Sequence, residues 1–462
     1  MESSTPQDLV ERGLEKSTAD GCVVIVDRTS SANLRWANNT LTTNGVTRGS
    51  TVTVISTVDG AQGTASAALS RSASAVDEVL DLVAAADRAA RDAGPAEDAA
   101  ALVDGTADGD WSGAPEVTDI DVLEPVARDL GEAFERADAS DRLLYGYVEH
   151  TTTTTYLGSS TGVRRRHVQP GGHIGITGKD TGLSRSAWVG RATRDFSDVD
   201  ALALDRELER RLGWAERSVD LGPGRYDTVL PPTAVADLMI DTYWAAGARD
   251  AYDGRTVFAR PGGGTRIGDR LSERPVRLYS DPYASGLECA PFVTAHASGA
   301  DTSVFDNGIP LERADWIGGG ELRALRQTRH TAALTDQPVT PSIDNLVMDV
   351  DGATAAPEDL VRHVKRGLLL TCLWYIREVD AQTLLLTGLT RDGVYLVENG
   401  EITGAVNNFR FNESPVDLLG RITDASFSVP TFSREWGDEF LRTSMPALRI
   451  PDFNMSSVSR AS

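Results

Sequence analysis

Apolar residues recur with helical spacing in some stretches of the chain and with strand spacing in others. Residues 5–8 predict a helix start, because Thr5 can cap the helix, Pro6 suits its first position and Asp8 can close a capping box. The run 22–26 predicts a buried strand, and 31–36 and 51–57 alternate as half-exposed strands. A second helix is predicted from the spacing of Val76, Val79, Leu80 and Val83. The segment 1–105 therefore predicts an α+β subdomain.

A second segment follows an acidic connector at 97–113 that is rich in Ala, Gly and Asp. It begins with a predicted helix at 122–137 and ends with a helix that carries Leu204, Leu208 and Leu212. Short strands are predicted between these helices at 143–149, 152–157, 163–168, 174–177 and 187–190. We therefore predict a second α+β subdomain at 113–222.

The third segment begins at the hinge 222–224, Gly-Pro-Gly. A strand at 226–230 leads to a helix that opens at Pro232 and ends at Gly247. Further on, three strands are expected to form a β-meander, with Asn399-Gly400 suited to a type I′ turn: 384–387, 394–397 and 402–406. The predicted fold class is α+β, with an α/β N-terminal region in two subdomains followed by a large β-rich C-terminal domain, 223–455, that contains an antiparallel sheet.

Composition narrows the function classes. The net charge of −23 over 462 residues argues against nucleic acid or an anionic membrane as a partner. The three cysteines, Cys22, Cys289 and Cys372, are scattered and suggest no disulfide framework. The segment 1–9 has no apolar signal-peptide core, and no apolar run approaches a membrane span. We expect a cytoplasmic protein.

Residues that could carry catalysis or hold a metal are sparse. No two of the six histidines stand three to five residues apart, and the helix predicted at 233–247 contains none. In that helix Asp237 and Asp241 share a face, so a hard-cation site is conceivable, but a solvated surface pair is favoured. Cys289 has no histidine near it in sequence, and a structural thiol is favoured. The basic cluster 164–167 is favoured as a solvated turn over a patch that pairs with acidic groups.

Four linked segments resemble the C-terminal signature of the TldD/PmbA family. They are Leu-Trp-Tyr-Ile-Arg at 373–377, the segment 387–393, Glu-Asn-Gly-Glu-Ile at 398–402, and the segment 408–415. A weaker resemblance appears at 304–310 and in the layout of the N-terminal half. The resemblance covers nearly the whole chain, strongly after about Tyr226.

The resemblance implies a particular role within the family. TldD-type subunits carry HExxxH on a helix and a cysteine ligand near the meander, and they act as cytosolic zinc metalloproteases on unfolded or extended peptides. Here the corresponding helix, 233–247, has no histidine, and no cysteine follows Cys372. The chain thus resembles the TldE (PmbA)-like subunit, with no catalytic, cofactor or metal residue of its own. The implied partner is a TldD-like HExxxH subunit that brings the zinc.

Five signature residues are the candidates for a peptide cleft: Thr390, Arg391, Asp392, Asn408 and Arg410. A buried arginine with amide and carboxylate neighbours could position a peptide backbone, although a structural role at strand ends is favoured. Two other functions stay open. One is a stand-alone homodimeric peptide-binding or regulatory protein. The other is a metalloprotease with non-standard ligands, such as His296 with Cys289 and carboxylates.

Overall fold

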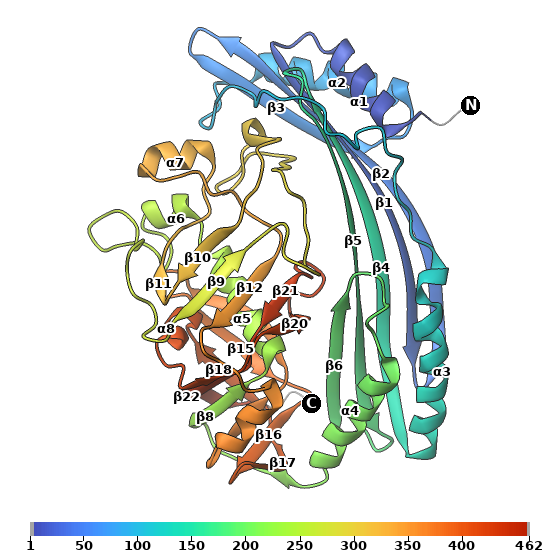
Figure 1. The fold of residues 1–462 in the computed structure, drawn as a ribbon, viewed down its shortest axis with the longest axis vertical. Helices are drawn as coiled ribbons and strands as arrows, with labels where there is room; N and C mark the ends of the chain where they lie inside the picture. The colour runs from blue at the N-terminus through green and yellow to red at the C-terminus, as the bar shows by residue number, and fades with distance from the viewer. Residues whose placement is uncertain (1–3, 460–462) are drawn as a thin grey trace.

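The N-terminal part of the molecule is a long, curved sheet. The computed structural model describes residues 4–459; residues 1–3, part of the segment expected to lack a signal-peptide core, lie outside the described residues. Six antiparallel strands form a wall along one side of the molecule in the order β3-β2-β1-β4-β5-β6 (Figure 1). Their bounds are β1 Gly21–Ala37, β2 Thr40–Gly60, β3 Gly63–Ser72, β4 Arg142–Ser159, β5 Arg164–Asp180 and β6 Ser186–Thr193.

The strands of this sheet are much longer than predicted. The stretches 22–26 and 31–36 both belong to β1, because the polar residues between them are paired on both sides. Asp27 lies opposite Thr51 on β2 and Thr155 on β4, and the Thr29 hydroxyl bonds the Thr153 hydroxyl at 3.1 Å. Cross-strand hydroxyl pairs of this kind stabilise a sheet as apolar pairs do.

The sheet joins the two segments that we expected to be separate subdomains. Over fourteen residue pairs, from Val23↔Ser159 to Trp36↔Gly146, β1 lies beside β4, although the connector 97–113 separates them in sequence. The two segments therefore share one sheet, which their separate patterns did not predict. The positions of the domain boundaries stay a prediction.

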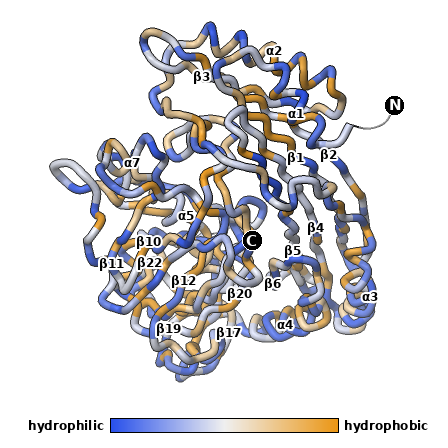
Figure 2. The backbone as a smooth tube through the Cα atoms, turned by 45° about the horizontal axis from the view of Figure 1, so that its top comes forward, coloured by the Kyte–Doolittle hydropathy of each residue, from blue (hydrophilic) through white to orange (hydrophobic). Residues whose placement is uncertain are grey.

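Four helices cover one face of the wall: α1 Pro6–Lys16, α2 Val76–Asp92, α3 Glu124–Ala139 and α4 Ala201–Trp214. The predicted capping box of α1 is confirmed, since Thr5 and Asp8 bond each other's backbone N–H. Alternation along β1 separates the two faces. Val24 and Val26 pack under α1 and α2, whereas Val23 and Ile25 face the C-terminal part of the chain. Figure 2 shows hydrophobic residues gathered in these layers.

The C-terminal part contains two further sheets. One has six strands in the order β11-β10-β9-β12-β21-β20, and the other has ten, in the order β14-β15-β18-β22-β8-β13-β16-β17-β7 with β19 beside β22. The strands of the first are β9 Val276–Ser280, β10 Ala314–Gly318, β11 Glu321–Leu322, β12 Leu346–Val350, β20 Val429–Thr431 and β21 Thr443–Met445. Those of the second are β7 Ser218–Val219, β8 Gly224–Leu230, β13 Arg366–Leu370, β14 Leu373–Asp380, β15 Leu385–Thr390, β16 Val394–Glu398, β17 Glu401–Val406, β18 Phe409–Glu413, β19 Asp424–Ala425 and β22 Leu448–Val458.

One helix, α5 (Pro232–Trp244), lies inside this domain and contacts both sheets. Buried residues occur all around it, so it is a core helix and not an amphipathic surface helix. The short helices are α6 Ala248–Tyr252, α7 Arg329–Thr335, α8 Pro415–Leu419 and the 3₁₀ turns η1 Ile120–Leu123, η2 Val304–Asp306 and η3 Pro357–His363. No helix within residues 4–459 is long and apolar enough to cross a membrane.

The predicted meander is wrong in its first connection. β15 pairs with β14 and β18, whereas β16 pairs with β13 and β17, so the turn at 391–393 crosses the sheet and does not close a hairpin. The second connection is confirmed. Asn399 and Gly400 have φ of 53° and 82° and join β16 to β17 as a hairpin. Turn residues show where a strand ends but not which strand lies beside it.

Candidate functional site

Of the two acidic residues of α5, one is fully buried and the other is partly buried. Asp237 is 0% exposed, and Asp241 lies one turn further along, next to the loop 433–436 that leads from β20 toward β21. The expectation of a solvated surface pair is therefore wrong. The physical reason is that α5 runs between two sheets, which bury residues on all sides of the helix.

Asp237 bonds the loop through one oxygen. Its Oδ1 accepts a hydrogen bond from the Ser433 hydroxyl at 2.5 Å and another from the Glu435 backbone N–H at 2.9 Å. Its Oδ2 is buried and has no hydrogen-bond partner among the described residues. Burial raises the pKa of Asp237 to about 8, with a smaller contribution from the nearby carboxylate of Glu435. The side chain is therefore largely protonated at neutral pH, and Oδ2 is the natural position for the proton.

Asp241 and Glu435 complete the acidic cluster. The Trp436 indole N–H donates to Oδ2 of Asp241 at 3.1 Å, and burial raises the pKa of Asp241 to about 7. Glu435 accepts hydrogen bonds at 3.0 Å from the backbone N–H groups of Tyr375 and Ile376 on β14. Each carboxyl group thus holds a neighbouring segment of chain, and together they fix the loop 433–436 between α5 and β14.

This cluster does not fit a zinc ion. Protonated carboxyl groups are poor ligands, and the helix offers no imidazole. Cys372 is fully buried, and burial raises the pKa of its thiol to about 12, so no thiolate is available nearby. Across the described range 4–459, no group of three or more His, Cys, Asp or Glu side chains has a geometry that could hold a metal.

The residues considered as non-standard ligands lie in different environments. His296 bonds the Thr53 hydroxyl at 2.9 Å and lies 3.6 Å from the Asp27 carboxylate. Cys289 packs with Leu311 and Ile343, and burial raises its pKa to about 11. Neither arrangement creates a nucleophile or a ligand set.

The five signature residues lie close together where β15 and β18 run side by side. The Thr390 hydroxyl accepts from the Phe409 N–H at 2.8 Å, and Asp392, at φ 52°, accepts from the Ser186 hydroxyl on β6 at 2.5 Å. Arg391 lies 3.7 Å from Asp392, whereas Arg410 is exposed and donates to the Thr387 hydroxyl at 3.3 Å. The Asn408 carbonyl accepts from the Ser459 N–H at 2.8 Å. Arg391 is partly exposed and Arg410 is exposed, so neither is the buried arginine that a peptide cleft was expected to use.

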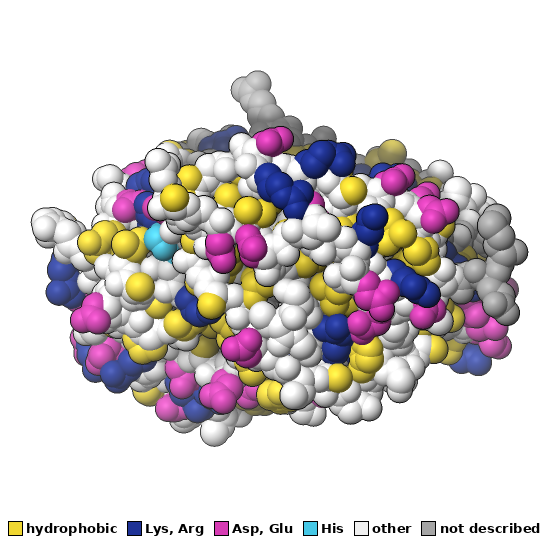
Figure 3. Space-filling view, turned by 90° about the horizontal axis from the view of Figure 1, so that it is seen from above, with side chains coloured by type: hydrophobic (Ala, Val, Ile, Leu, Met, Phe, Trp, Pro, Cys, Tyr) yellow, Lys and Arg dark blue, Asp and Glu magenta, His cyan; other side chains and the backbone are white. Residues whose placement is uncertain are grey.

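The basic cluster 164–167 lies on β5 and not in a turn. Three consecutive arginines reach acidic residues of the same chain: Arg164 bonds Glu11, Arg165 bonds Asp108 at 2.7 Å, and Arg166 bonds Asp110 at 3.0 Å. The expectation of a solvated turn is wrong, because Arg164 ties the sheet to α1, and Arg165 and Arg166 tie it to the connector. Positive and negative groups are likewise interspersed over the face seen in Figure 3.

A seam joins the N-terminal sheet to the C-terminal domain beside β6 and β20. Phe432 stacks on His173 of β5, with ring centres 5.0 Å apart, and also contacts Trp188 of β6. The Arg434 guanidinium lies between Trp188 and Trp374, at 4.8 Å and 3.9 Å from the ring centres. The segment 432–436 therefore contacts both α5 and the N-terminal sheet.

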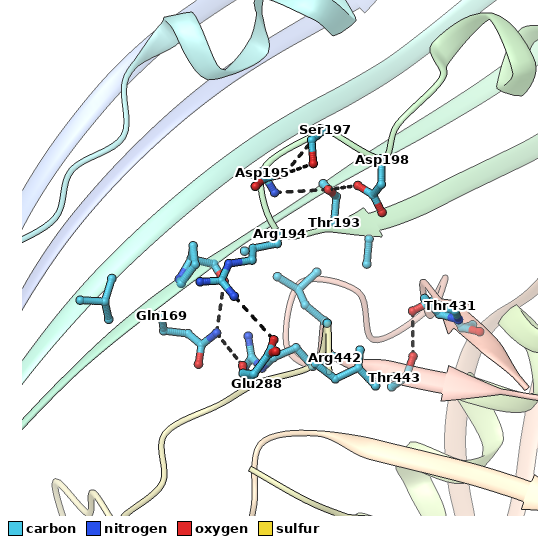
Figure 4. Close-up of a pocket in the computed structure, with 18 of the residues that line it drawn as sticks. Gln169, Thr193, Arg194, Asp195, Ser197, Asp198, Glu288, Thr431, Arg442 and Thr443 are labelled. Atoms are coloured by element: carbon cyan, nitrogen blue, oxygen red, sulfur yellow. Dashed lines mark hydrogen bonds and ion pairs between the residues drawn. The ribbon is translucent and has the colours of Figure 1, made fainter. Parts of the chain in front are cut away.

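A pocket of about 260 Å³ lies on this seam (Figure 4). Arg194 and Glu288 face each other across it at 3.6 Å, and Gln169 donates to the Glu288 carbonyl at 3.2 Å. Arg442 enters from the C-terminal domain, and Asp195 and Asp198 lie at the other end. No sequence pattern pointed to this pocket, since its residues come from four distant segments that share no local motif.

The three β-sheets and the closed acidic cluster define an α+β protein whose core helix α5 offers no zinc ligands. Residues 223–457 match the PmbA/TldA metallopeptidase C-terminal domain, and residues 22–93 match the PmbA/TldA metallopeptidase domain 1. The chain belongs to the PmbA/TldD family, as the signature segments predicted.

Solved structures share the whole fold. TldE from Thermococcus kodakarensis superposes with a TM-score of 0.77 at 14% identity, covering 97% of this chain and 99% of that one. A candidate modulator of DNA gyrase from Bacteroides thetaiotaomicron superposes with a TM-score of 0.75 at 13% identity, with 98% of each chain covered. Another candidate modulator, from Thermotoga maritima, superposes with a TM-score of 0.74 at 14% identity, covering 97% of this chain and 100% of that one. Comparison with curated protein sequences gave no match.

Proposed function

We propose that this chain is the non-catalytic, TldE-like subunit of a heteromeric zinc metallopeptidase that processes unfolded or extended peptides. The proposal depends mainly on one observation, the hydrogen bonding and protonation of Asp237 and Asp241 on α5. Its carboxyl groups, one fully and one partly buried, are largely or partly protonated at neutral pH and bonded to the loop 433–436. A helix committed to these contacts has no group free to bind a metal or activate water.

In this assembly, zinc and the general base come from a TldD-like partner that carries HExxxH. The overall similarity to a protein named TldE supports this assignment, and so does the family membership. A cytoplasmic location belongs to the same proposal and agrees with three unpaired, buried cysteines.

The signature residues receive a structural role in this proposal. Thr390 and Asp392 hold the end of β15 to β18 and to β6. Arg410 is the member of the set whose exposed side chain could reach a peptide bound at the assembled cleft.

The decisive experiment is light scattering on the chain alone and after mixing with the HExxxH homologue of the same genome. We expect a new mixed species, and cleavage of an unstructured fluorogenic peptide in that fraction but not in the fraction of this chain alone. A mixed complex whose partner carries Gln in place of the HExxxH glutamate serves as the inactive control. A homodimer that ignores the homologue, or stoichiometric zinc in the chain purified alone, would overturn the proposal.

A further inference from the structure

The seam pocket contains hydrogen-bonding groups that the fold does not use. Both halves of the molecule line it, with β5 and β6 on one side and the segments 286–288 and 430–443 on the other. Apolar side chains form part of its wall: Pro170, Leu287, Pro430 and Leu441. Apolar walls with a few convergent polar groups are typical of small-ligand sites.

One end of the pocket is basic. The side chain of Arg442 is 16% exposed, and its Nε and Nη2 bond the backbone carbonyl and the carboxylate of Asp344. Its Nη1 has no hydrogen-bond partner among residues 4–459 and lies beside Gly171, where a Cβ atom would come within 3.8 Å of it. Arg194 provides a second guanidinium, 60% exposed, that is held at 3.6 Å from Glu288.

His167 also lines this end of the pocket but adds no third positive charge to it. Burial lowers the pKa of His167, so the ring is neutral at neutral pH, and its Nε2 lies 3.0 Å from Oε1 of Gln169. An unused guanidinium N–H in a partly desolvated site is a strong donor for a carboxylate.

The other end of the pocket is acidic. Asp195 and Asp198 lie in the turn between β6 and α4, and Figure 4 shows them together, away from Glu288 and Arg442. Asp195 accepts from the backbone and the hydroxyl of Ser197, which hold its pKa below the usual range, and Asp198 accepts from the Thr193 hydroxyl. Within the described structure neither carboxylate forms a salt bridge, so both can attract a cation.

We infer that the seam pocket binds a small zwitterion, a free amino acid or a short peptide with free termini. Its carboxylate lies at Arg442 and Arg194, and its ammonium group lies at Asp195 and Asp198. The ligand class follows from the presence of basic and acidic groups in one pocket and from a volume of about 260 Å³, too small for a folded partner. The biological meaning of this site, as a sensor or product site in peptide processing, rests on the function proposed above.

The test is isothermal titration of the full chain, without any partner, using alanine, dialanine and trialanine as probes. We expect one-to-one binding that is tightest for one of the three, which identifies the source as an amino acid or a peptide. The N-acetyl and C-terminal amide forms of that probe should bind at least about tenfold more weakly, since each removes one charge contact. No binding by any probe, or equal binding of the blocked forms, would overturn the inference.

Matched variants locate the ligand. Arg194→Gln and Asp198→Asn should each weaken binding about tenfold, and Gly171→Leu should abolish it by filling the pocket. Arg206→Gln, which changes an exposed arginine outside the pocket, should leave affinity unchanged. Arg442→Gln is a weaker test, because Arg442 also bonds Asp344 and its loss could disturb the fold. The site is therefore judged from the other variants. Unchanged affinity in Arg194→Gln and Asp198→Asn would contradict the site, while the result of the partner experiment would stand separately.

Discussion

At the scale of single residues, Asp237 shows how a carboxyl group can serve as a neutral hydrogen-bonding group. One of its oxygens accepts two hydrogen bonds from the loop 433–436, and the other is enclosed without a partner within the described structure. An ionised carboxylate in that position would be strongly desolvated. The fold therefore favours the protonated form.

This preference predicts a pH-dependent stability. The pKa of Asp237 is raised from 3.8 to about 8, so the folded chain keeps a proton that the unfolded chain releases. Its stabilising contribution is fully present below about pH 4 and is lost as pH rises toward 8. The free energy of unfolding should fall by up to about 1.4 kcal/mol per pH unit between pH 5 and 8 from this group. Asp237→Asn should remove that slope, as measured by urea unfolding at each pH.

The exposed Asp220 provides the control for this prediction. Asp220→Asn should keep the slope of the wild-type protein, because its carboxyl group is solvated in both states. An Asp237→Asn variant that is as pH-sensitive as the wild type, or strongly destabilised at pH 5, would show that Asp237 is ionised in the fold.

At the scale of elements, the β16–β17 hairpin depends on one glycine. Gly400 has φ 82°, and a Cβ atom added there would come within 2.8 Å of the Arg362 carbonyl oxygen. Gly400→Ala should destabilise the chain by about 2–4 kcal/mol, from positive φ and this clash together. Thermal unfolding measures the loss.

A glycine in an open strand is the matched control. Gly49 on β2 has no atom within 4 Å of an added Cβ, so Gly49→Ala should be neutral or stabilise by up to about 1 kcal/mol. Equal effects of the two substitutions would mean that the hairpin turn carries no strain.

Features with a local cause were predictable from the sequence. The cap of α1 at Thr5, the start of α5 at Pro232 and the Asn399-Gly400 turn each depend on residues within a few positions of one another. The burial of Asp237 was not predictable, since its partner Ser433 is 196 residues away. The strands that pair with β15 and β16 were not predictable either, because strand pairing across a large sheet is set by contacts between distant residues.

At the scale of the whole molecule, the aromatic seam controls how firmly the two halves hold each other. Phe432 is 6% exposed and contacts both His173 and Trp188. Phe432→Ala should destabilise this junction by about 3 kcal/mol and speed hydrogen exchange in β6 and β20, while the core of α5 stays protected. Hydrogen-exchange mass spectrometry resolves these segments.

Phe427 offers the comparison, since it lies five residues away and is 44% exposed. Phe427→Ala should leave exchange in β6 and β20 unchanged. If both variants loosened the whole domain alike, or if neither changed the seam, the two halves would not be joined through Phe432.

The position of β22 has a consequence for biosynthesis. This strand, Leu448–Val458, lies in the middle of the ten-stranded sheet, between β18 and β8. During translation, the nascent chain must carry two unpaired strand edges until β22 leaves the ribosome, whereas the N-terminal sheet can close once β6 has emerged. Exposed edges are sites of aggregation, so the C-terminal domain should be more prone to aggregate than the N-terminal sheet until β22 is made.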